Sequence, residues 1–337
     1  MVCGKRIELP GPVAMTLSGF ERFENSKKSL ESNSKARFLD RWSSPHTHPG
    51  GSVIRLVIQK LRVLVMFLLR RLVSGPGRRN ALTGLERLAG SARGKNVLVL
   101  GSGPSAKKIN AAAVAKAQKE GELVVVATNY FLSSPLAKTI TPDYLVWSDE
   151  VFHPRHLSSQ KAWGELELHG TVTVVSPWTW QAKIPHDLRS RFVFFDNDTL
   201  ETWSTNISPM RPRGYQGTTG TKALAFGIHL QPRTTYLIGL DLSYFRNFSV
   251  DADNRLHRHP THLAGTDSGV QDLSSLSVSG IADALYSTAN QFYYLRRLFS
   301  SSPVINLDPD SLVDAFPKAG SHPFIKAPRK RASGKTQ

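Results

Sequence analysis

From Lys95 onwards, short runs of aliphatic and β-branched residues alternate with stretches of helical periodicity, and this alternation constrains the fold more than any other feature. Strands are predicted at residues 96–100, 123–127, 144–147, 171–176, 192–195, 235–238 and 304–307. Helices are predicted at residues 105–119, within 151–163, at 218–230 and at 279–299. Buried apolar strands separated by helices predict an α/β fold with a mostly parallel, Rossmann-like sheet and helices on both of its faces.

The first predicted strand runs directly into the turn Gly101-Ser-Gly-Pro-Ser-Ala106, which matches the pattern G-x-G-x-x-A. Gly101 and Gly103 would let the backbone approach a phosphate, and the following helix would supply N–H donors. Pro104 suits the first position of a helix, and Ser102 and Ser105 are candidate caps or phosphate donors. The alternative is a tight turn that holds no ligand.

A dinucleotide site makes a further demand that this sequence does not meet. Sites for NAD place Asp or Glu at the end of the second strand, where the carboxylate holds the ribose. Here the second predicted strand is followed by Thr128 and Asn129. Asn129 can hydrogen-bond a ribose or a base, so the sequence favours a nucleotide but does not favour NAD.

Two more polar clusters lie where parallel sheets keep their sites, at the carboxyl ends of the strands. Thr218, Thr219 and Gly220 open an Ala-rich helix, where hydroxyls and backbone N–H groups would form a second anion site. The alternative for this cluster is a simple helix cap. Gly239 and Asp241 follow the strand at 235–238, where an acidic side chain could hold sugar hydroxyls.

A long segment without clear periodicity follows, at about residues 243–278, and a loop of this length usually forms a functional lid or is disordered. It contains three histidines within six residues, of which His259 and His262 are candidate catalytic groups. A neutral imidazole can remove a proton from a hydroxyl near pH 7. Metal binding is the weaker interpretation, because no Cys or acidic ligand lies beside them. A solvated loop is the other alternative.

The net charge of +17 resides in the two ends of the chain. Residues 1–94 and 318–337 are strongly basic, whereas residues 95–317 hold 20 basic and 20 acidic side chains. We expect residues 318–337 to form a basic, solvated tail. A nucleic-acid-binding domain carries its basic surface on its folded part, so nucleic acid is not a predicted partner. The single Cys3 excludes a disulfide framework or a Cys-based zinc site and fits a reducing compartment.

Residues 51–75 form the most distinctive part of the basic N-terminal region, and they follow a segment at 1–50 that we expect to be disordered. At about 100° per residue, one half of the helical wheel holds Arg55, Gln59, Lys60, Arg62, Arg70 and Arg71. Leu, Ile and Val fill the other half. The longest stretch of this segment without a charged residue is far too short to span a bilayer. The pattern is typical of a helix at an anionic membrane surface. The alternatives are a helix packed on the domain with a solvated basic face, and nucleic-acid binding.

Taken in order, these motifs resemble the bacterial lipooligosaccharide sialyltransferases of the Campylobacter type. They also resemble wider relatives, namely the flagellin-modifying glycosyltransferases and the hydroxymethylpterin diphosphokinase-like proteins. The similar stretches are Val97–Ser105, Thr128–Phe131, Thr218–Gly220, Tyr236–Asp241 and Leu307–Leu312, together with the His-containing lid. The resemblance covers residues 95–317.

The resemblance implies a single α/β domain, a variant of the GT-A glycosyltransferase fold, that needs no metal or other cofactor. Such an enzyme transfers sialic acid from its cytidine monophosphate (CMP) conjugate to a sugar hydroxyl with inversion. Gly101–Ser105 would face the donor phosphate, Asn129 and Thr218–Gly220 would hold the nucleotide and the sugar, and Gly239 and Asp241 would line the cytidine pocket. His262 is the best match for the catalytic base.

This chain departs from the family pattern at several of these positions. Tyr244 is the one clear candidate among the tyrosines that bind the leaving phosphate, and it is offset by one residue. His259 stands where a tyrosine is expected before the base. Gln216 stands where the family has an arginine, although Arg211 and Arg213 lie close by in the sequence.

The leading hypothesis is therefore a cytoplasmic glycosyltransferase, peripheral on the inner face of the membrane, that uses a CMP-activated donor and a cell-surface glycan as acceptor. A phosphotransferase that uses ATP and Mg²⁺ is the second hypothesis, with Asp149, Glu150 and Asp241 as candidate metal ligands. A non-catalytic nucleotide-binding protein at the membrane is the third. A second copy of the chain remains an open possibility as a further partner.

Overall fold

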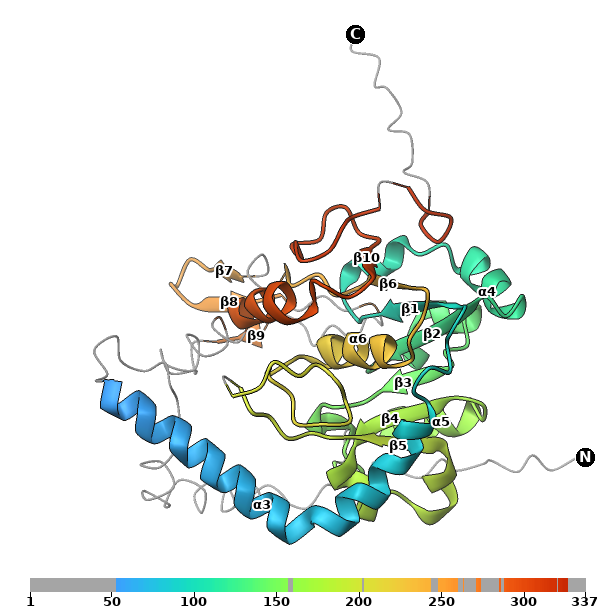
Figure 1. Cartoon of the computed structure of the whole chain (residues 1–337). Helices are drawn as coiled ribbons and strands as arrows, with labels where there is room; N and C mark the ends of the chain where they lie inside the picture. The colour runs from blue at the N-terminus through green and yellow to red at the C-terminus, as the bar shows by residue number, and fades with distance from the viewer. Residues whose placement is uncertain are drawn as a thin grey trace, which may run out of the picture. The chain divides into compact units, whose positions relative to one another are not determined.

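The structure is a computed structural model that describes residues 53–156, 160–201, 203–243, 248–259, 263, 271–273, 285, 288–319 and 321–326. Its centre is a seven-stranded sheet in the order β10-β6-β1-β2-β3-β4-β5, in which every pair of neighbours is parallel (Figure 1). The strands are β1 (Asn96–Leu100), β2 (Leu123–Thr128), β3 (Tyr144–Val146), β4 (Thr173–Pro177), β5 (Phe192–Phe195), β6 (Thr234–Ile238) and β10 (Val304–Asn306). The predicted α/β fold is confirmed.

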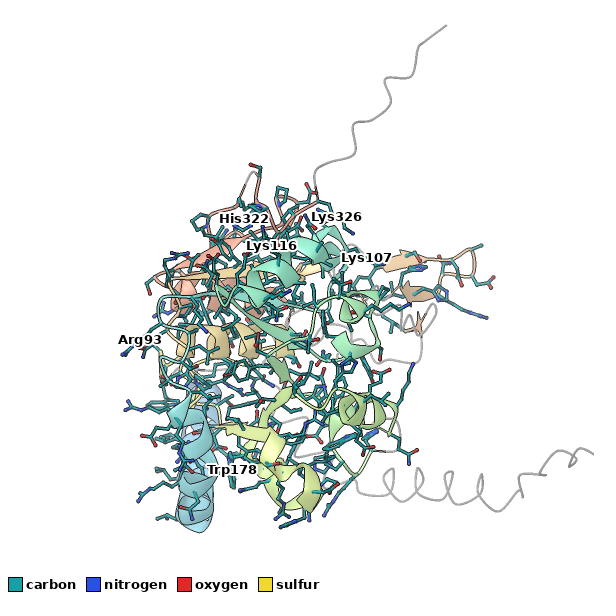
Figure 2. The ribbon with its side chains drawn as sticks, turned by 90° about the vertical axis from the view of Figure 1, so that its right-hand side faces the viewer. Arg93, Lys107, Lys116, Trp178, His322 and Lys326 are labelled. Atoms are coloured by element: carbon teal, nitrogen blue, oxygen red, sulfur yellow. The ribbon has the colours of Figure 1, made fainter. Side chains whose placement is uncertain are left out.

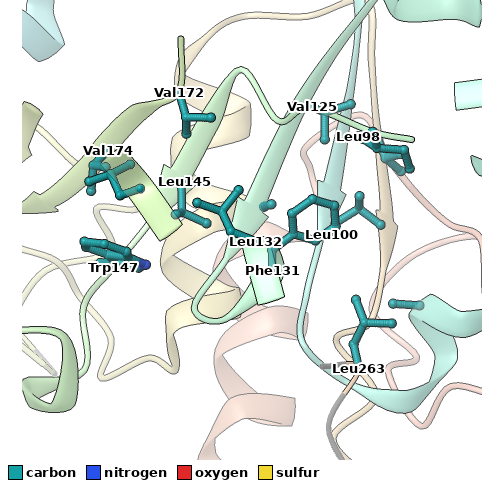
Figure 3. Packing of buried hydrophobic residues seen from close by; sticks show 14 of the residues in the cluster. Leu98, Leu100, Val125, Phe131, Leu132, Leu145, Trp147, Val172, Val174 and Leu263 are labelled. Atoms are coloured by element: carbon teal, nitrogen blue, oxygen red, sulfur yellow. The ribbon is translucent and has the colours of Figure 1, made fainter. Parts of the chain in front are cut away.

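The strands are buried on both sides because their side chains alternate between two apolar clusters. Leu98 and Leu100 of β1 belong to one cluster, whereas Val97 and Val99 belong to the other. Figure 3 shows the first cluster, which Leu98, Leu100, Val125, Leu145 and Val174 build from four neighbouring strands. No strand of this sheet therefore turns a polar face to water, which is why the sequence reads as continuous apolar runs.

Helices cover both clusters. α4 (Ala111–Lys119) and α5 (Gln160–Leu168) contribute Val114 and Leu166 to the first cluster. α6 (Thr219–His229) contributes Leu224 and Phe226 to the second cluster. The predicted helix at 105–119 is interrupted, because the short helix η1 (Pro104–Lys108) ends before Asn110 caps α4. Asn110 Oδ1 accepts the N–H of Ala113, which is the bond that starts a new helix there.

The basic helix is longer than predicted, since α3 extends over Val53–Arg87 and continues through Gly75, Pro76 and Gly77. Figure 1 shows that α3 is bent. Pro76 lacks a backbone N–H, and helices commonly bend at such residues. Leu85 near its end is fully buried in the second cluster, so the folded body begins before Lys95. Within the part of the chain that the structure describes, no helix is both long enough and apolar enough to cross a membrane.

One of the predicted solvent- or lipid-facing arginines contacts the protein instead. Arg71 and Arg78, two turns apart on α3, both place a guanidinium nitrogen near Asp196 Oδ2, at 2.5 and 2.8 Å. Asp196 follows β5 and is fully buried. A buried carboxylate needs such partners, because burial without them would cost several kcal/mol. α3 therefore meets the body through a polar contact.

The predicted lid contains regular structure where we expected a loop. β7 (Phe248–Val250), β8 (Leu256–Arg258) and β9 (Gln271–Asp272) form a small antiparallel sheet. Asp251 Oδ1 accepts the N–H groups of Asp253 and Arg255, each at 2.9 Å, and Asn254 adopts a positive φ of 59°. Asp and Asn are favoured in turns of this kind. The turn joins β7 and β8, which are too short for their sequences to show the alternation of apolar and polar residues expected of a strand.

The segment assigned to a basic tail begins inside the folded body. Lys318 pairs with Asn306 beside β10, Ile325 pairs with Ile109, and Phe324 is buried. Lys326 donates its ammonium to Lys107 O at 3.0 Å, and Figure 2 shows these two residues together. The apolar Phe-Ile pair explains the difference from the charge-based prediction. Residues 1–50, predicted to be disordered, lie outside the described residues.

Candidate functional site

The turns after β1 and β6 lie side by side at the carboxyl edge of the sheet, where the chain order reverses. Open α/β sheets bind their ligands at such a point. A Cβ atom on Gly101 would lie 2.2 Å from Gly239 O, and Gly239 itself has a φ of 78°. Both positions therefore require glycine for the contact between the two turns.

Most backbone donors of the Gly101–Ser105 turn are used within the protein. The N–H of Gly101 donates to Ile238 O at 2.8 Å, and that of Gly103 donates to Gly239 O at 2.9 Å. The N–H of Ser105 donates to Asp241 Oδ2 at 3.0 Å. η1 has five residues, and Pro104 is its first. The geometry therefore differs from the phosphate cradle that we expected, because the neighbouring turn occupies these donors.

Asp241 is buried against this turn. Burial raises the pKa of its carboxyl above that of a free aspartate, although hydrogen bonds from Ser105 oppose the shift. Asp241 Oδ1 is buried and finds no hydrogen-bond partner among the described residues. A buried acceptor of this kind is rare in folded proteins and indicates a missing donor.

Asn129 occupies the other side of β1, directly after β2. It adopts a positive φ of 53°, which Asn tolerates better than most residues, and its side-chain Nδ2 lies 3.4 Å from Asp149 Oδ2. Asn129 Oδ1 is buried and, within the described ranges, has no partner. β1 is thus flanked at its carboxyl end by two unsatisfied acceptors, on Asn129 and Asp241.

The N-terminus of α6 points to the same edge. The Thr218 hydroxyl accepts the N–H of Thr221 and caps the helix. The Thr219 hydroxyl lies 2.7 Å from the Ser148 hydroxyl, which follows β3. A Cβ atom on Gly220 would lie 2.8 Å from a methyl carbon of Leu240, so this glycine lets α6 approach the β6 turn. Hydroxyls from two elements therefore meet at the start of α6.

Lys222 lies in the first turn of α6, and sequence reasoning did not identify it. Its ammonium donates to the Ser148 hydroxyl at 3.1 Å, and no described carboxylate lies within ion-pair distance. Burial, together with the nearby positive charge of Arg213, lowers the pKa of Lys222 to about 8, although the carboxylates of Asp149 and Glu150 oppose the shift. A cation at a helix N-terminus also opposes the helix dipole. These features together describe a buried positive site that makes no close ion pair with a described carboxylate.

Arg213 lies behind Lys222 and is itself buried. Its Nη2 donates to Asn197 O at 3.2 Å, whereas Nε and Nη1 have no partner in the described part of the chain. The hydroxyl of the fully buried Tyr215 is also without one. Arg213, Tyr215 and Lys222 line a cavity of about 10 Å³. That volume is near the minimum for one water molecule, which would satisfy some of these groups.

The predicted catalytic residues are only partly described. Tyr244 and His262 lie outside the described residues. His259 is exposed at the end of β8, where its Nε2 lies 2.7 Å from the Ser249 hydroxyl. Leu263, the residue after His262, is buried, and its N–H donates to Ser102 O at 2.8 Å. This hydrogen bond joins Leu263 to the Gly101–Ser105 turn, and Figure 3 shows the Leu263 side chain with those of the first apolar cluster.

The structure brings most of the described candidates to one edge, and it adds Ser148, Lys222 and Arg213 to them. A lysine in the first helical turn after the Gly- and Thr-rich stretch 217–221 is the signal that could have identified Lys222. Ser148 and Arg213 carry no such signal, because only the folded chain places them beside α6. Among the described residues, no three His, Cys, Asp or Glu side chains are grouped as metal ligands.

No protein-family model matches the chain, and no curated protein matches it. A solved structure that aligns with part of the chain is that of the MAf glycosyltransferase from Magnetospirillum magneticum AMB-1, with a TM-score of 0.40 and 15% sequence identity. The likeness covers 71% of this chain, and it spans 38% of the length of that glycosyltransferase. We therefore infer the function from the residues of this chain.

Proposed function

We propose that the protein is an inverting, metal-independent glycosyltransferase that moves a sialic-acid-like sugar from a CMP-activated donor to a hydroxyl of a cell-surface glycan. One observation carries the proposal: Lys222, Ser148 and Thr219 form a positive, hydroxyl-lined site at the start of α6. This site lies at the carboxyl edge of a parallel sheet, where nucleotides bind.

The site suits the phosphate of the donor. A CMP-linked sugar carries one phosphodiester charge, and bond cleavage increases the negative charge on the leaving phosphate. Lys222, the N-terminus of α6 and the hydroxyls of Ser148 and Thr219 would stabilise that charge without a metal ion. The burial of Lys222 supports this assignment: Asp149 and Glu150 act on it only from beyond ion-pair distance, so the phosphate would supply a closer counter-ion. We therefore assign the donor phosphate to α6 rather than to Gly101–Ser105.

The nucleoside and sugar would lie on either side of β1. Asn129 Oδ1 and Asp241 Oδ1 are buried acceptors without partners among the described residues, and the ribose or sugar hydroxyls and the cytosine amino group are donors. The Gly101–Gly239 contact would form the floor of this binding site. These observations support nucleotide-sugar binding at the β1–β6 switch point.

We assign the catalytic base to His262. The acceptor hydroxyl attacks the anomeric carbon, the bond from that carbon to the phosphate oxygen breaks, and the electron pair leaves with CMP. The acceptor proton passes to His262 in the same step. The hydrogen bond from Leu263 to Ser102 supports this role, since it attaches the lid to the nucleotide edge. Tyr244 is assigned to the leaving phosphate, and His259 is retained as an alternative base.

Phosphate transfer from ATP with Mg²⁺ is the competing function. It requires carboxylates that converge on one ion. Asp149 contacts Asn129, whereas Asp241 contacts Ser105 on the opposite side of β1. The arrangement therefore favours the transferase over the phosphotransferase. A non-catalytic nucleotide-binding protein would use the same contacts as the proposed transferase, so only a measurement of turnover distinguishes the two.

Thermal unfolding of the full chain with CMP, UDP, ATP or NAD, each with EDTA and then with Mg²⁺, tests the proposal. We expect CMP with EDTA to raise the melting temperature by about 5 °C or more at a concentration near 100 times Kd, where binding contributes about 2.7 kcal/mol. Stabilisation by ATP only with Mg²⁺ would favour the phosphotransferase. The absence of stabilisation by any nucleotide would contradict the proposed function.

We also propose that α3 holds the enzyme at an anionic membrane surface on the cytoplasmic side. Val65, Leu68, Leu69 and Leu72 are exposed on one face of α3, and the exposed fraction of Leu72 is 80%. These exposures support the membrane surface over the alternative of a helix that packs its apolar face on the domain. Arg62, which is exposed beside this stripe, supplies charge that complements anionic headgroups. A membrane location would bring the enzyme to lipid-anchored glycan acceptors.

A further inference from the structure

A second pocket lies beside the candidate nucleotide site, and none of the predicted site residues lines it. It encloses about 360 Å³ between the connection from β5 to α6 and the helical segment 288–299. This volume falls within the range of small-molecule sites, about 300–1,000 Å³. Its lining residues are Glu201, Trp203, Ser204, Thr205, Gly214, Tyr293, Tyr294, Arg297 and Leu298.

Two large aromatic side chains of this pocket are exposed. Trp203 is 49% exposed and Tyr293 is 53% exposed, and they come from elements far apart in the sequence. Two exposed aromatic rings that line one pocket mark a binding site better than scattered apolar residues do. Their flat faces would pack against an apolar ring face, and their polar edges can remain in contact with water.

Charged groups lie beside the rings. The Tyr294 hydroxyl donates to Glu201 Oε1, and the Arg297 guanidinium lies 5.8 Å from the centre of the Tyr293 ring. The pocket thus combines flat apolar surfaces with a carboxylate and a guanidinium. A pyranose ring offers the complement, because one of its faces is lined with C–H groups and its edge carries hydroxyls that donate and accept.

The same helical segment connects this pocket to the start of α6. Gln291 Oε1 accepts the Thr221 hydroxyl at 3.0 Å, and Gln291 Nε2 donates to Gln216 O at 2.9 Å. Tyr293, Tyr294 and Arg297 follow within two turns of helix. The pocket and the proposed donor phosphate site therefore lie along the same helical segment.

We propose that this pocket binds a sugar ring of the glycan acceptor, with Trp203 and Tyr293 against its C–H face and Glu201 and Arg297 at its hydroxyls. The role as acceptor site rests on the proposed function. The binding of a sugar ring does not, since it follows from the pocket alone. The pocket would also explain how a hydroxyl acceptor is recognised separately from the nucleotide.

Saturation-transfer NMR on the full chain tests the proposal with methyl β-galactopyranoside and methyl β-glucopyranoside as probes and cyclohexanol as an apolar control. We expect a signal from at least one pyranoside and a weaker one from cyclohexanol. Trp203→Ala and Tyr293→Ala should each lower pyranoside affinity by roughly tenfold. Trp203→Phe, which keeps a ring, should retain most of the binding. Leu168→Ala is the matched control, because Leu168 is an exposed apolar residue on α5.

Three results would overturn the sugar site: no signal from either pyranoside with the wild-type chain, equal signals from cyclohexanol and the pyranosides, or unchanged binding in Trp203→Ala. Melting curves of the variants identify any loss of pyranoside binding that is due to unfolding. If Trp203→Ala is unfolded, binding by Tyr293→Ala decides whether the pocket is the sugar site. Nucleotide stabilisation is measured separately. If the protein binds pyranosides but CMP does not stabilise it, the proposed function is contradicted and the sugar site is retained. If CMP stabilises the protein but no pyranoside binds, only the sugar site is contradicted.

Discussion

At the scale of single residues, the placement of Lys222 is the main electrostatically unfavourable feature of the free protein. A lysine in the first turn of a helix opposes the helix dipole, and the buried Arg213 nearby adds a second positive charge. Proteins normally pair buried charges, because an unpaired one costs several kcal/mol. An arrangement that stays unfavourable in the free protein becomes favourable when an anion binds. We therefore treat Lys222 as the residue whose titration reports on phosphate binding.

The affinity for CMP should fall as the pH rises above about 8, where the free protein loses the Lys222 proton. A bound phosphate favours the charged lysine, so binding takes up a proton at high pH and weakens by up to about tenfold per pH unit. CMP itself is fully ionised there, because its second phosphate pKa is near 6. Calorimetric titration at pH 7 to 9.5 measures the effect. Lys222→Met should bind weakly at pH 7 and show no such fall, whereas Lys116→Met on α4 should match the wild type.

The stability of the free protein should change with pH in the opposite sense. The unfolded chain keeps the Lys222 proton up to about pH 10.5, whereas the folded chain releases it near pH 8. Because the unfolded state holds more protons in this window, the free energy of unfolding should rise with pH relative to that of Lys222→Met. Parallel pH profiles of the two proteins in urea would contradict the lowered pKa.

At the scale of elements, α3 combines two surfaces with different chemistry. Arg71 and Arg78 contact the buried Asp196, and Leu85 lies in the core, so one side of the helix belongs to the body. Val65, Leu68, Leu69 and Leu72 are exposed on the other side. The helical wheel places these four residues on one face, as their exposure in the structure also does. It could not predict the use of Arg71, because Asp196 lies 125 residues away in the sequence.

Leu68→Glu and Leu72→Glu should each weaken binding to vesicles of phosphatidylcholine and phosphatidylglycerol by about tenfold or more. Burying one leucine contributes about 1.5–3 kcal/mol, and a new carboxylate would also be repelled by the anionic lipid. Leu168→Glu on α5, another exposed leucine, should leave vesicle binding unchanged. Co-sedimentation at low and high salt measures both contributions. Equal binding by the wild type and Leu72→Glu would contradict the proposed membrane surface.

At the scale of the whole molecule, the strand pattern predicted the sheet well because each strand is buried on both faces. β1 and β5 have the predicted bounds; β2, β3, β6 and β10 differ by one residue at one end, and β4 differs by two residues at its start and one at its end. The site was harder to predict. The G-x-G-x-x-A pattern indicated a phosphate turn, whereas the glycines serve a contact with Gly239. Contacts such as that between Ser148 and Lys222 depend on how β3 and α6 pack together, and this packing cannot be predicted from the local sequence of either element.

The lid raises the last question at this scale, namely whether it brings a base to the nucleotide edge. Leu263 attaches it to Ser102, while His259 contacts Ser249 within the small sheet. His262→Ala should therefore slow CMP release from CMP-N-acetylneuraminic acid by about 10²–10⁴ in the presence of a glycan acceptor, whereas His259→Ala should stay near the wild-type rate. Stabilisation by CMP should be the same in all three proteins, because the base contacts the acceptor and not the nucleotide. A wild-type rate in His262→Ala would remove the base assignment. If only His259→Ala loses activity, the catalytic base would be His259, next to the small sheet. If the wild-type enzyme releases no CMP, the assignment of a CMP-activated sugar as the donor would be wrong.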